Sequence, residues 1–275
     1  MAVIAFWGNE KEETAKTTSL VATTTLMTLE NNLKCLVTST EYNNYSLESC
    51  FWDIGEKKPE LHGNMGGTLD SGIDGLMKLL KSNKITPELI PNYTKSVFKG
   101  RLEILFGQGN KPIEEYQNTL PLYKEIIVNA KEYYDLVFID LSKETNTKLV
   151  NDILSISDII VYTVSQRMEL IQNYLKEIET NDMIDKKRVM VLLGRYDKFS
   201  KFNSKNVARL VGEKQVYSVP YNTLFFEACN DSTVANFFIK YRNIDESDRN
   251  FVFINEIRNF VNAIKYKIEE LQMIR

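Results

Sequence analysis

Residues 5–18 read AFWGNEKEETAKTT: a short apolar run, then a polar loop, then Lys16 and Thr17 at the start of a helical pattern. The apolar run predicts a buried strand, and the pattern that follows predicts a helix over residues 17–29. Free amide groups at the N-terminus of a helix bind anions, and a lysine beside them adds positive charge. This stretch therefore predicts a phosphate-binding turn between a first strand and a first helix.

The spacing matches part of the pattern G-x-x-x-x-G-K-[ST], in which backbone amides wrap phosphates, the lysine reaches the outer phosphates and the hydroxyl binds Mg²⁺. Lys16 and Thr17 occupy the lysine and hydroxyl positions, but Glu10 and Ala15 stand where the pattern has glycine. Glycine lets the backbone approach a phosphate closely, so its loss threatens the shape of the loop. The alternative is that Lys11 and Lys16 form a solvated basic pair and Thr17 is an ordinary helix cap.

The rest of the chain alternates short apolar runs with longer helical patterns, which is typical of a mostly parallel sheet covered on both faces. Two runs, 136–139 and 189–193, are apolar on both strand faces, as buried central strands require. No repeat or flexible linker divides the chain, so we expect one α/β domain over residues 1–275. The expected strands are 3–7, 36–39, 102–106, 136–140, 159–164, 189–193 and 216–219, and further helices are expected over 73–80, 122–133, 170–179, 204–210 and 254–274.

Composition excludes several classes of protein. With 275 residues, 43% of them hydrophobic, and a net charge of -3, the chain is neither disordered throughout nor devoted to coating nucleic acid. Cys35, Cys50 and Cys229 form neither a disulfide framework nor a metal-binding cluster, which favours a reducing compartment. There is no signal-peptide pattern and no apolar stretch of the ~18 to 20 residues that would span a bilayer. We therefore expect a soluble, cytoplasmic protein.

A resemblance to a known family rests on several separate motifs. Lys11-x-x-x-x-Lys16-Thr17-Thr18, placed after a first strand, resembles the deviant Walker motif K-G-G-x-G-K-T-T of the ParA/MinD family of P-loop ATPases. Residues 133–140, YYDLVFID, are similar to the family's Walker B strand, which ends in an acid that helps hold magnesium.

Three later segments extend the resemblance over most of the chain. Residues 157–164 resemble the family's next strand, and residues 195–197, RYD, close a later strand as in similar sequences. Residues 219–222, VPYN, resemble the proline-containing loop that borders the adenine. The last two segments look most like the TadZ/CpaE group, which positions pilus-assembly machinery at cell poles.

The resemblance implies a three-layer P-loop NTPase fold with about seven to eight strands, binding of ATP and Mg²⁺, and a homodimer closed around ATP. The implied catalytic residues are Lys11, which would contact the partner subunit's phosphates, Lys16 and Asp140. The implied metal ligands are Thr17 and Asp140, with Glu41 as the acidic stand-in after the second strand. The implied nucleotide-binding residues are Gly8, Thr14, Ala15, Lys16, Thr17, Thr18, Arg195, Pro220, Tyr221 and Asn222.

Departures from the family pattern keep two functions open. Three loop glycines are replaced by Glu12, Glu13 and Ala15, and an asparagine that commonly meets the base is replaced by Gly194. A carboxylate beside a polyphosphate is repelled by ~1 kcal/mol or more per charge pair at 4 Å. One hypothesis is an ATP-hydrolysing switch for intracellular positioning, such as chromosome partitioning or localisation of pilus machinery. The alternative is a non-hydrolysing scaffold of the same fold.

Two further features bear on partners. The stretch from Lys186 to Arg209 includes many basic residues and a single acid, Asp197. Such a stretch raises a weaker alternative, a DNA-binding partition protein. A solvated basic surface is the simpler interpretation. The apolar stripe of residues 254–274 is expected to pack on the sheet, and peripheral membrane contact is a weaker alternative because the polar face mixes acids with bases. The sequence thus predicts a homodimer with an unidentified protein partner, in the cytoplasm, at a cell pole or against the membrane.

Overall fold

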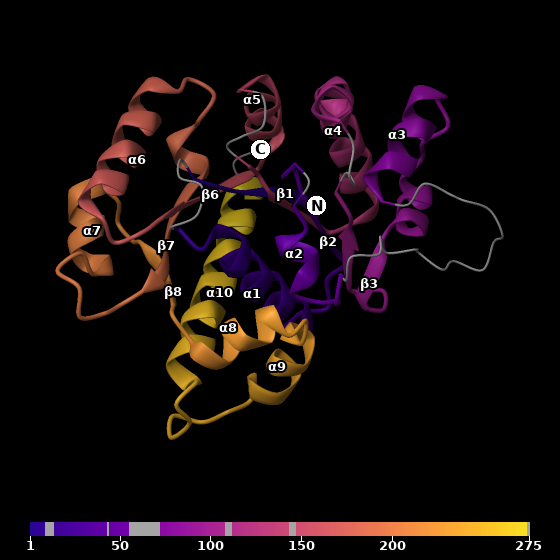
Figure 1. Ribbon diagram of the computed structural model, residues 1–275. Helices are drawn as coiled ribbons and strands as arrows, with labels where there is room; N and C mark the ends of the chain where they lie inside the picture. The colour runs from indigo at the N-terminus through magenta and orange to yellow at the C-terminus, as the bar shows by residue number, and fades with distance from the viewer. Residues whose placement is uncertain (9–13, 43, 55–71, 108–111, 143–146, 274–275) are drawn as a thin grey trace.

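An eight-stranded sheet forms the centre of the protein. The computed structural model describes residues 1–8, 14–42, 44–54, 72–107, 112–142 and 147–273 (Figure 1). The elements in chain order are β1 (Ala2–Trp7), α1 (Lys16–Glu30), β2 (Cys35–Ser39), α2 (Ser46–Ser49), α3 (Ile73–Lys81), η1 (Pro87–Tyr93), β3 (Lys95–Phe98), β4 (Leu102–Leu105), α4 (Ile113–Tyr133), β5 (Leu136–Asp140), α5 (Thr147–Ile156), β6 (Ile159–Val164), α6 (Met168–Thr180), η2 (Lys186–Arg188), β7 (Val189–Tyr196), α7 (Ser204–Val211), β8 (Tyr217–Pro220), α8 (Thr223–Asn230), α9 (Val234–Tyr241) and α10 (Phe251–Met273).

The strands lie in the order β3-β4-β2-β5-β1-β6-β7-β8. Every neighbouring pair is parallel except β3 and β4, which are antiparallel. Strands β1 and β5 lie at the middle and are fully buried, which explains why their sequences are apolar on both faces. The expected mostly parallel sheet of seven to eight strands is therefore confirmed.

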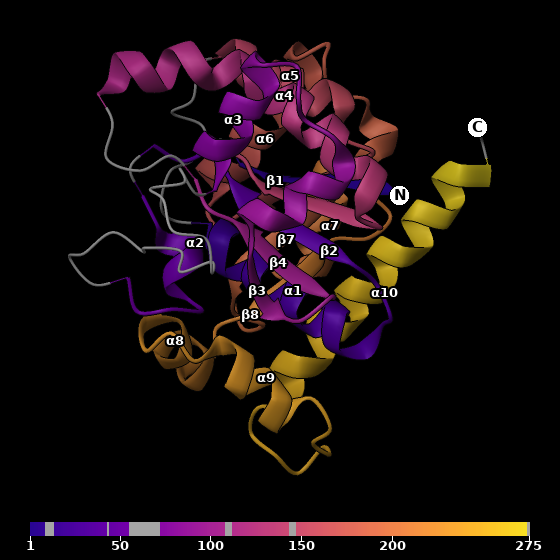
Figure 2. The ribbon, with the colours of Figure 1, turned by 90° about the vertical axis from the view of Figure 1, so that its right-hand side faces the viewer.

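Helices cover the sheet on both sides and make three layers. One apolar core packs α3, α4, α5, α6 and α7 against one face, and a second packs α1, α2, α8, α9 and α10 against the other. Figures 1 and 2 show these two groups of helices on opposite sides of the sheet. In parallel sheets of this kind, ligands bind at the edge formed by the carboxyl ends of the strands. Gly8, which follows β1, and the start of α1 lie at that edge.

Helix α1 is buried along most of its length, from Ser19 to Thr28. Buried hydroxyl groups need hydrogen-bond partners, and the threonines here find them within the helix. Thr23 and Thr25, for example, each donate to the carbonyl four residues earlier, at 2.7 Å. The helix can therefore lie between the sheet and α10 even though its sequence is rich in threonine.

Several elements were not expected from the sequence. β3 is a four-residue strand of mixed polarity, KSVF, and it lies at the edge of the sheet, where a continuous apolar run is not required. Helices α5, α8 and α9 are only eight to ten residues long, and α2 has four. Short helices carry few turns of periodic signal, so such patterns are easily missed.

Helix α10 confirms the expectation that the C-terminal stripe packs on the protein itself. Ile254, Ile257, Val261 and Ile264 are buried in the core that α10 shares with α1 and β8. The end of the helix extends beyond the sheet (Figure 2). Within the described residues, none of the helices has the length and apolar character needed to cross a membrane.

Candidate phosphate-binding site

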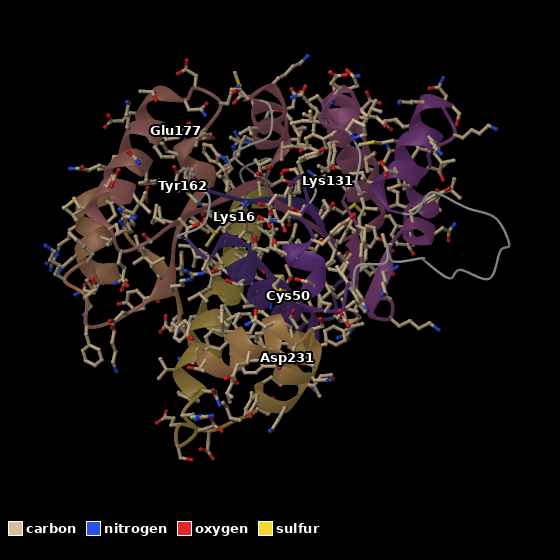
Figure 3. All side chains as sticks on the ribbon, in the orientation of Figure 1. Lys16, Cys50, Lys131, Tyr162, Glu177 and Asp231 are labelled. Carbon is tan, nitrogen blue, oxygen red and sulfur yellow. The ribbon has the colours of Figure 1, made fainter. Side chains whose placement is uncertain are left out.

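Lys16, Thr17 and Asp140 meet at the carboxyl edge of the sheet. Asp140 ends β5 and pairs in register with Phe6 of β1, so it lies beside the turn that leads into α1. The Lys16 Nζ atom is 2.7 Å from Asp140 Oδ1, and the Thr17 hydroxyl donates to Asp140 Oδ2 at 2.7 Å. Lys16 also donates to the Leu141 carbonyl at 2.6 Å. Figure 3 shows Lys16 at the centre of the molecule, at the start of α1.

The side chains of this cluster are largely buried, so the interactions between their charges are stronger than they would be in water. Asp140 is only 1% exposed, and the Lys16 side chain is 16% exposed. A buried carboxylate is stable only when charged or hydrogen-bonding partners compensate it, and here both oxygens have one. The structure therefore brings together the lysine, the hydroxyl and the acid that the sequence predicted to act together.

Ala15 keeps the backbone shape that a glycine would adopt at this position. Its φ of 52° and ψ of 36° lie in the left-handed region, which costs a residue with a Cβ roughly 1–2 kcal/mol. The Thr18 hydroxyl donates to the Ala15 carbonyl at 3.1 Å and helps to hold the turn. The loss of glycine was expected to threaten the shape of the loop; at Ala15 the described turn is retained, with local strain.

Gly194 of β7 lies directly against the turn, a contact that the sequence did not reveal. A Cβ atom added to Gly194 would lie 1.8 Å from the Thr14 carbonyl oxygen and 3.2 Å from the Ala15 Cβ. At this position of β7 only glycine leaves room for the turn. The resemblance implies a weaker contact with the base where glycine replaces asparagine; in the structure Gly194 makes room for the turn.

A second close contact joins the turn to β6. A Cβ atom on Gly8 would lie 2.7 Å from the Thr163 carbonyl oxygen, so β1 and β6 approach closely there. The Thr163 hydroxyl is 3.2 Å from the Trp7 carbonyl and 3.3 Å from the Thr14 hydroxyl. Thr163 was not predicted, although a threonine near the end of an otherwise apolar strand is a usable signal, because its buried hydroxyl needs a partner.

Two further carboxylates lie on the β2 side of the site. Burial raises the pKa of Glu41, the nearby Asp140 raises it further, and Lys16 opposes the shift. Burial also raises the pKa of Glu48 to about 7, although its Oε1 atom accepts a hydrogen bond from the Gly107 amide at 3.1 Å. Glu41 thus lies close enough to Asp140 and Lys16 for their charges to shift its pKa. Glu48 was not predicted.

The remaining predicted residues lie farther along the sheet. Arg195 is exposed, with a φ of 49°, directly after Gly194. Pro220 ends β8 and Tyr221 and Asn222 follow it, three strand spacings or about 14 Å from β1. The Asn222 side chain caps α8 by accepting from the Phe225 amide at 2.8 Å and donates to Asn250 at 2.9 Å. Asn222 is therefore already engaged by the protein, and Lys11 lies outside the described residues.

The donors at the turn suit a hard cation bound with phosphate. Hydroxyl and carboxylate oxygens, as on Thr17 and Asp140, are ligands that Mg²⁺ prefers, and it usually takes only one or two carboxylates because phosphates and water complete its shell. Within the described ranges, no group of three or more His, Cys, Asp or Glu side chains is arranged to hold a metal ion. The residues at this site thus fit Mg²⁺ bound with phosphate better than a dedicated all-protein metal cage.

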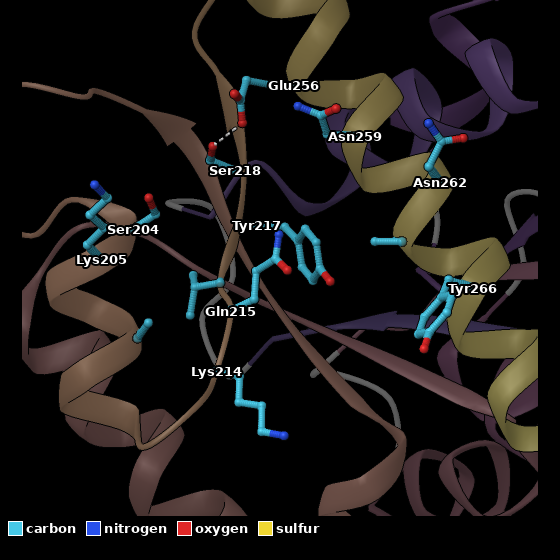
Figure 4. Close-up of a pocket in the computed structure, with 13 residues that line it drawn as sticks. Ser204, Lys205, Lys214, Gln215, Tyr217, Ser218, Glu256, Asn259, Asn262 and Tyr266 are labelled. Atoms are coloured by element: carbon cyan, nitrogen blue, oxygen red, sulfur yellow. Dashed lines mark hydrogen bonds between the residues drawn. The ribbon is translucent and has the colours of Figure 1, made fainter.

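A separate groove of about 630 Å³ lies between α7, β8 and α10 (Figure 4). Its lining includes Lys214, Tyr217 and Tyr266, and the Ser218 hydroxyl donates to Glu256 at 2.9 Å across it. None of the predicted nucleotide-binding residues lines this groove, so it is distinct from the site at Lys16.

Comparison with known proteins shows the fold. No protein-family model matches the chain, and no curated protein matches its sequence. Among solved structures, a ParA family ATPase from Chlorobium tepidum has a TM-score of 0.71 at 11% identity, covering 94% of this chain and 98% of that one. MinD from Pyrococcus horikoshii complexed with Mg-ADP has a TM-score of 0.64 at 13% identity, covering 97% and 98%.

The MinC:MinD cell division complex of Aquifex aeolicus provides a third similar chain, with a TM-score of 0.62 at 14% identity and coverage of 95% and 96%. The similarity extends over nearly the whole length of each protein. It shows that this chain has the fold of the ParA and MinD ATPases.

Proposed function

We propose that this protein is a nucleotide-dependent switch of the ParA/MinD class that binds ATP with Mg²⁺, dimerises and recruits a protein partner for intracellular positioning. The observation that carries the proposal is the cluster of Lys16, Thr17 and Asp140 at the start of α1. Such a cluster at the carboxyl edge of a parallel sheet combines a helix N-terminus, a cation and metal-binding oxygens. In this proposal residues 1–275 act as one domain.

Each residue of the turn has a definite part in the proposal. Lys16 binds the outer phosphates, and the amides around Gly8, Thr14 and Ala15 approach them with Thr18. Thr17 and Asp140 would hold Mg²⁺, with Glu41 as a further acidic group; the metal would neutralise phosphate charge. Arg195 and the segment Pro220, Tyr221 and Asn222 border the base. Lys11 is proposed to reach the phosphates bound by the second copy, as the resemblance implies.

The likeness to solved ParA and MinD structures supports this class of function. A similar MinD chain was solved with Mg-ADP, and another was solved in complex with MinC. Within the class, the Arg195 and Pro220 segments favour localisation of pilus machinery at a cell pole, as in the TadZ/CpaE group. The proposal places the protein in the cytoplasm, at a pole or peripheral to the membrane.

Calorimetry with Mg-ATP tests the proposal directly. We expect saturable binding by the wild type and loss of at least about tenfold in affinity for Lys16→Ala, since the phosphate-binding cation is removed. Lys187→Ala is the matched control, because Lys187 is exposed at the amino end of β7. Light scattering should show a dimer with ATP and less of it with ADP. An absence of heat at millimolar Mg-ATP, with an unchanged melting temperature, refutes the proposal.

A second candidate function is a scaffold that binds nucleotide or dimerises without hydrolysis. The observation that favours it is the strained Ala15 turn, together with the replacement of loop glycines by Glu12 and Glu13. Steady phosphate release by the wild type that disappears in Lys16→Ala would exclude the scaffold. No turnover despite ATP binding would exclude the ATPase.

A further inference from the structure

The surface between α6 and α7 combines an apolar groove with positive charge. The groove has a volume of about 460 Å³, and beside it the loop 197–203 carries Phe199, which is 86% exposed. We call the groove and this loop the α6–α7 surface. The groove is lined by Met168, Lys201, Phe202, Asn206, Arg209 and Leu210.

The loop that carries Phe199 is held firmly in place. Gln166 donates to the carbonyls of Asp197 and Phe202 at 2.8 and 2.9 Å, and accepts from the Asp197 amide at 2.7 Å. The Phe199 amide donates to the Asp197 carboxylate at 2.9 Å, and Asn206 donates to the Lys201 carbonyl at 2.8 Å. An exposed aromatic ring on a pre-ordered loop loses little conformational freedom on binding, which is the property of a recognition anchor.

The positive charge of this surface is local. Lys198, Lys201 and Arg209 are exposed on this surface, whereas the protein as a whole has a net charge of -3. The other half of the basic stretch lies elsewhere, because Lys186 and Lys187 precede β7 and the strand separates them from this loop by about 26 Å. The basic stretch of the sequence is therefore two separate surfaces.

The nearby acids do not cancel the charge around the groove. Glu169 pairs with Arg167 at 3.4 Å, and Asp197, whose carboxylate accepts the Phe199 amide, is outnumbered by the cations Lys198, Lys201 and Arg209. Lys201 and Arg209 belong to the groove itself, where they accompany the apolar side chains of Met168, Phe202 and Leu210. A complementary ligand must therefore present apolar groups to the groove and negative charge to its cations.

We propose that the α6–α7 surface binds an acidic amphipathic helix of a partner protein. An apolar face can fill the groove while glutamates or aspartates meet Lys201 and Arg209, which is the helix-in-groove mode of recognition. Duplex DNA fits less well, because phosphates cannot occupy a groove lined by Met168 and Leu210. A bilayer is flat and would touch projecting residues but not the interior of a groove. The proposal does not depend on nucleotide binding at Lys16.

The test measures binding of a fluorescein-labelled, hydrocarbon-stapled peptide of about 20 residues, long enough to be helical, with leucines on one face and glutamates elsewhere. We expect saturable fluorescence anisotropy with the wild type. The double variant Lys201→Glu/Arg209→Glu should weaken binding roughly tenfold or more, and Phe199→Ala should weaken it several-fold. The matched control Lys186→Glu/Lys187→Glu changes the net charge equally and should bind within about twofold of the wild type.

Controls on the ligand separate the partner classes. A scrambled peptide of the same composition and a lysine version of the same helix should both fail to bind. No binding of the glutamate helix up to about 1 mM, or equal binding by both double variants, overturns the proposal. It is also overturned if duplex DNA or phosphatidylserine vesicles bind through Lys201 and Arg209 while the peptide does not. Loss of self-association in Lys201→Glu/Arg209→Glu, with peptide binding unchanged, would assign the surface to a second copy instead.

Discussion

Replacing Gly194 with alanine should damage the turn that we propose binds phosphate, although Gly194 itself has no part in the proposed binding. The new Cβ would lie 1.8 Å from the Thr14 carbonyl oxygen and 2.9 Å from its carbonyl carbon. Both of these are backbone atoms, so no flexible side chain can swing away. The turn or the end of β7 must move by more than about 1 Å before the contact becomes tolerable.

The size of the effect follows from this overlap. Forcing an extra methyl group into a packed site typically costs about 1–3 kcal/mol. For a chain of this length that corresponds to a fall in melting temperature of roughly 2–6 °C. Because Thr14 directly precedes Ala15 and Lys16, the same movement misplaces the amides that face the proposed ligand. We expect Mg-ATP affinity to fall by about tenfold or more.

Thermal unfolding and calorimetry measure the two effects, and Gly107→Ala is the matched control. A Cβ on Gly107 would meet the Ser39 carbonyl at 3.6 Å, an ordinary contact, so this variant should melt and bind like the wild type. If Gly194→Ala retained both the melting temperature and the affinity of the wild type, the close contact between β7 and the turn would not be what shapes the site.

Three other predictions concern the Ala15 turn, the buried Glu48 and the buried cysteines. Ala15→Gly should relieve the left-handed strain and stabilise the protein by about 0.5–1 kcal/mol net of the added chain entropy, measured by urea denaturation; a loss of stability would contradict this. Because burial raises the pKa of Glu48 from 4.5 to about 7, the folded state holds this proton more tightly, so stability should fall by about 3 kcal/mol as the pH rises from 4.5 through 7. Glu48→Gln should flatten that slope in urea midpoints taken at pH 5 and pH 8, and an unchanged slope would count against the assignment. A hydrogen bond with Cys50 and burial raise the pKa of Cys229, and burial raises that of Cys35, so a thiol reagent should label the native protein slowly and the urea-unfolded protein fast; rapid native labelling would contradict this.

The central sheet was predictable because its strands are buried on both faces. Residues of β5 and β6 carry unbroken apolar runs, and such runs can be read without knowledge of their neighbours. The cluster of Lys16, Thr17 and Asp140 was anticipated as well, because residues 11–18 and 133–140 resemble two motifs of the ParA/MinD family. Edge strand β3 and short helices such as α8 gave no comparable signal, since their packing is set by distant segments.

Gly194 shows the limit of sequence reasoning most clearly. Its neighbour in space, Thr14, is far away in the chain, and the contact exists only after β1, β6 and β7 have assembled in that order. A single glycine at the end of an apolar run does not reveal which backbone will approach it. The hydrogen bond between Cys50 and Cys229 also joins residues far apart in the chain, and the sequence showed only that the cysteines are widely spaced.

The ion pair between Lys16 and Asp140 has a consequence for selectivity. Each charge already has a partner of opposite sign at 2.7 Å, so an entering ligand must replace an existing interaction rather than fill an empty place. An anion that bound Lys16 alone would leave the buried Asp140 carboxylate without its counter-ion, and a cation that bound Asp140 alone would leave the Lys16 ammonium group without one. Only a ligand that carries both signs at once leaves neither group stranded. We therefore expect metal-free nucleotide and nucleotide-free metal each to bind more weakly than Mg-ATP.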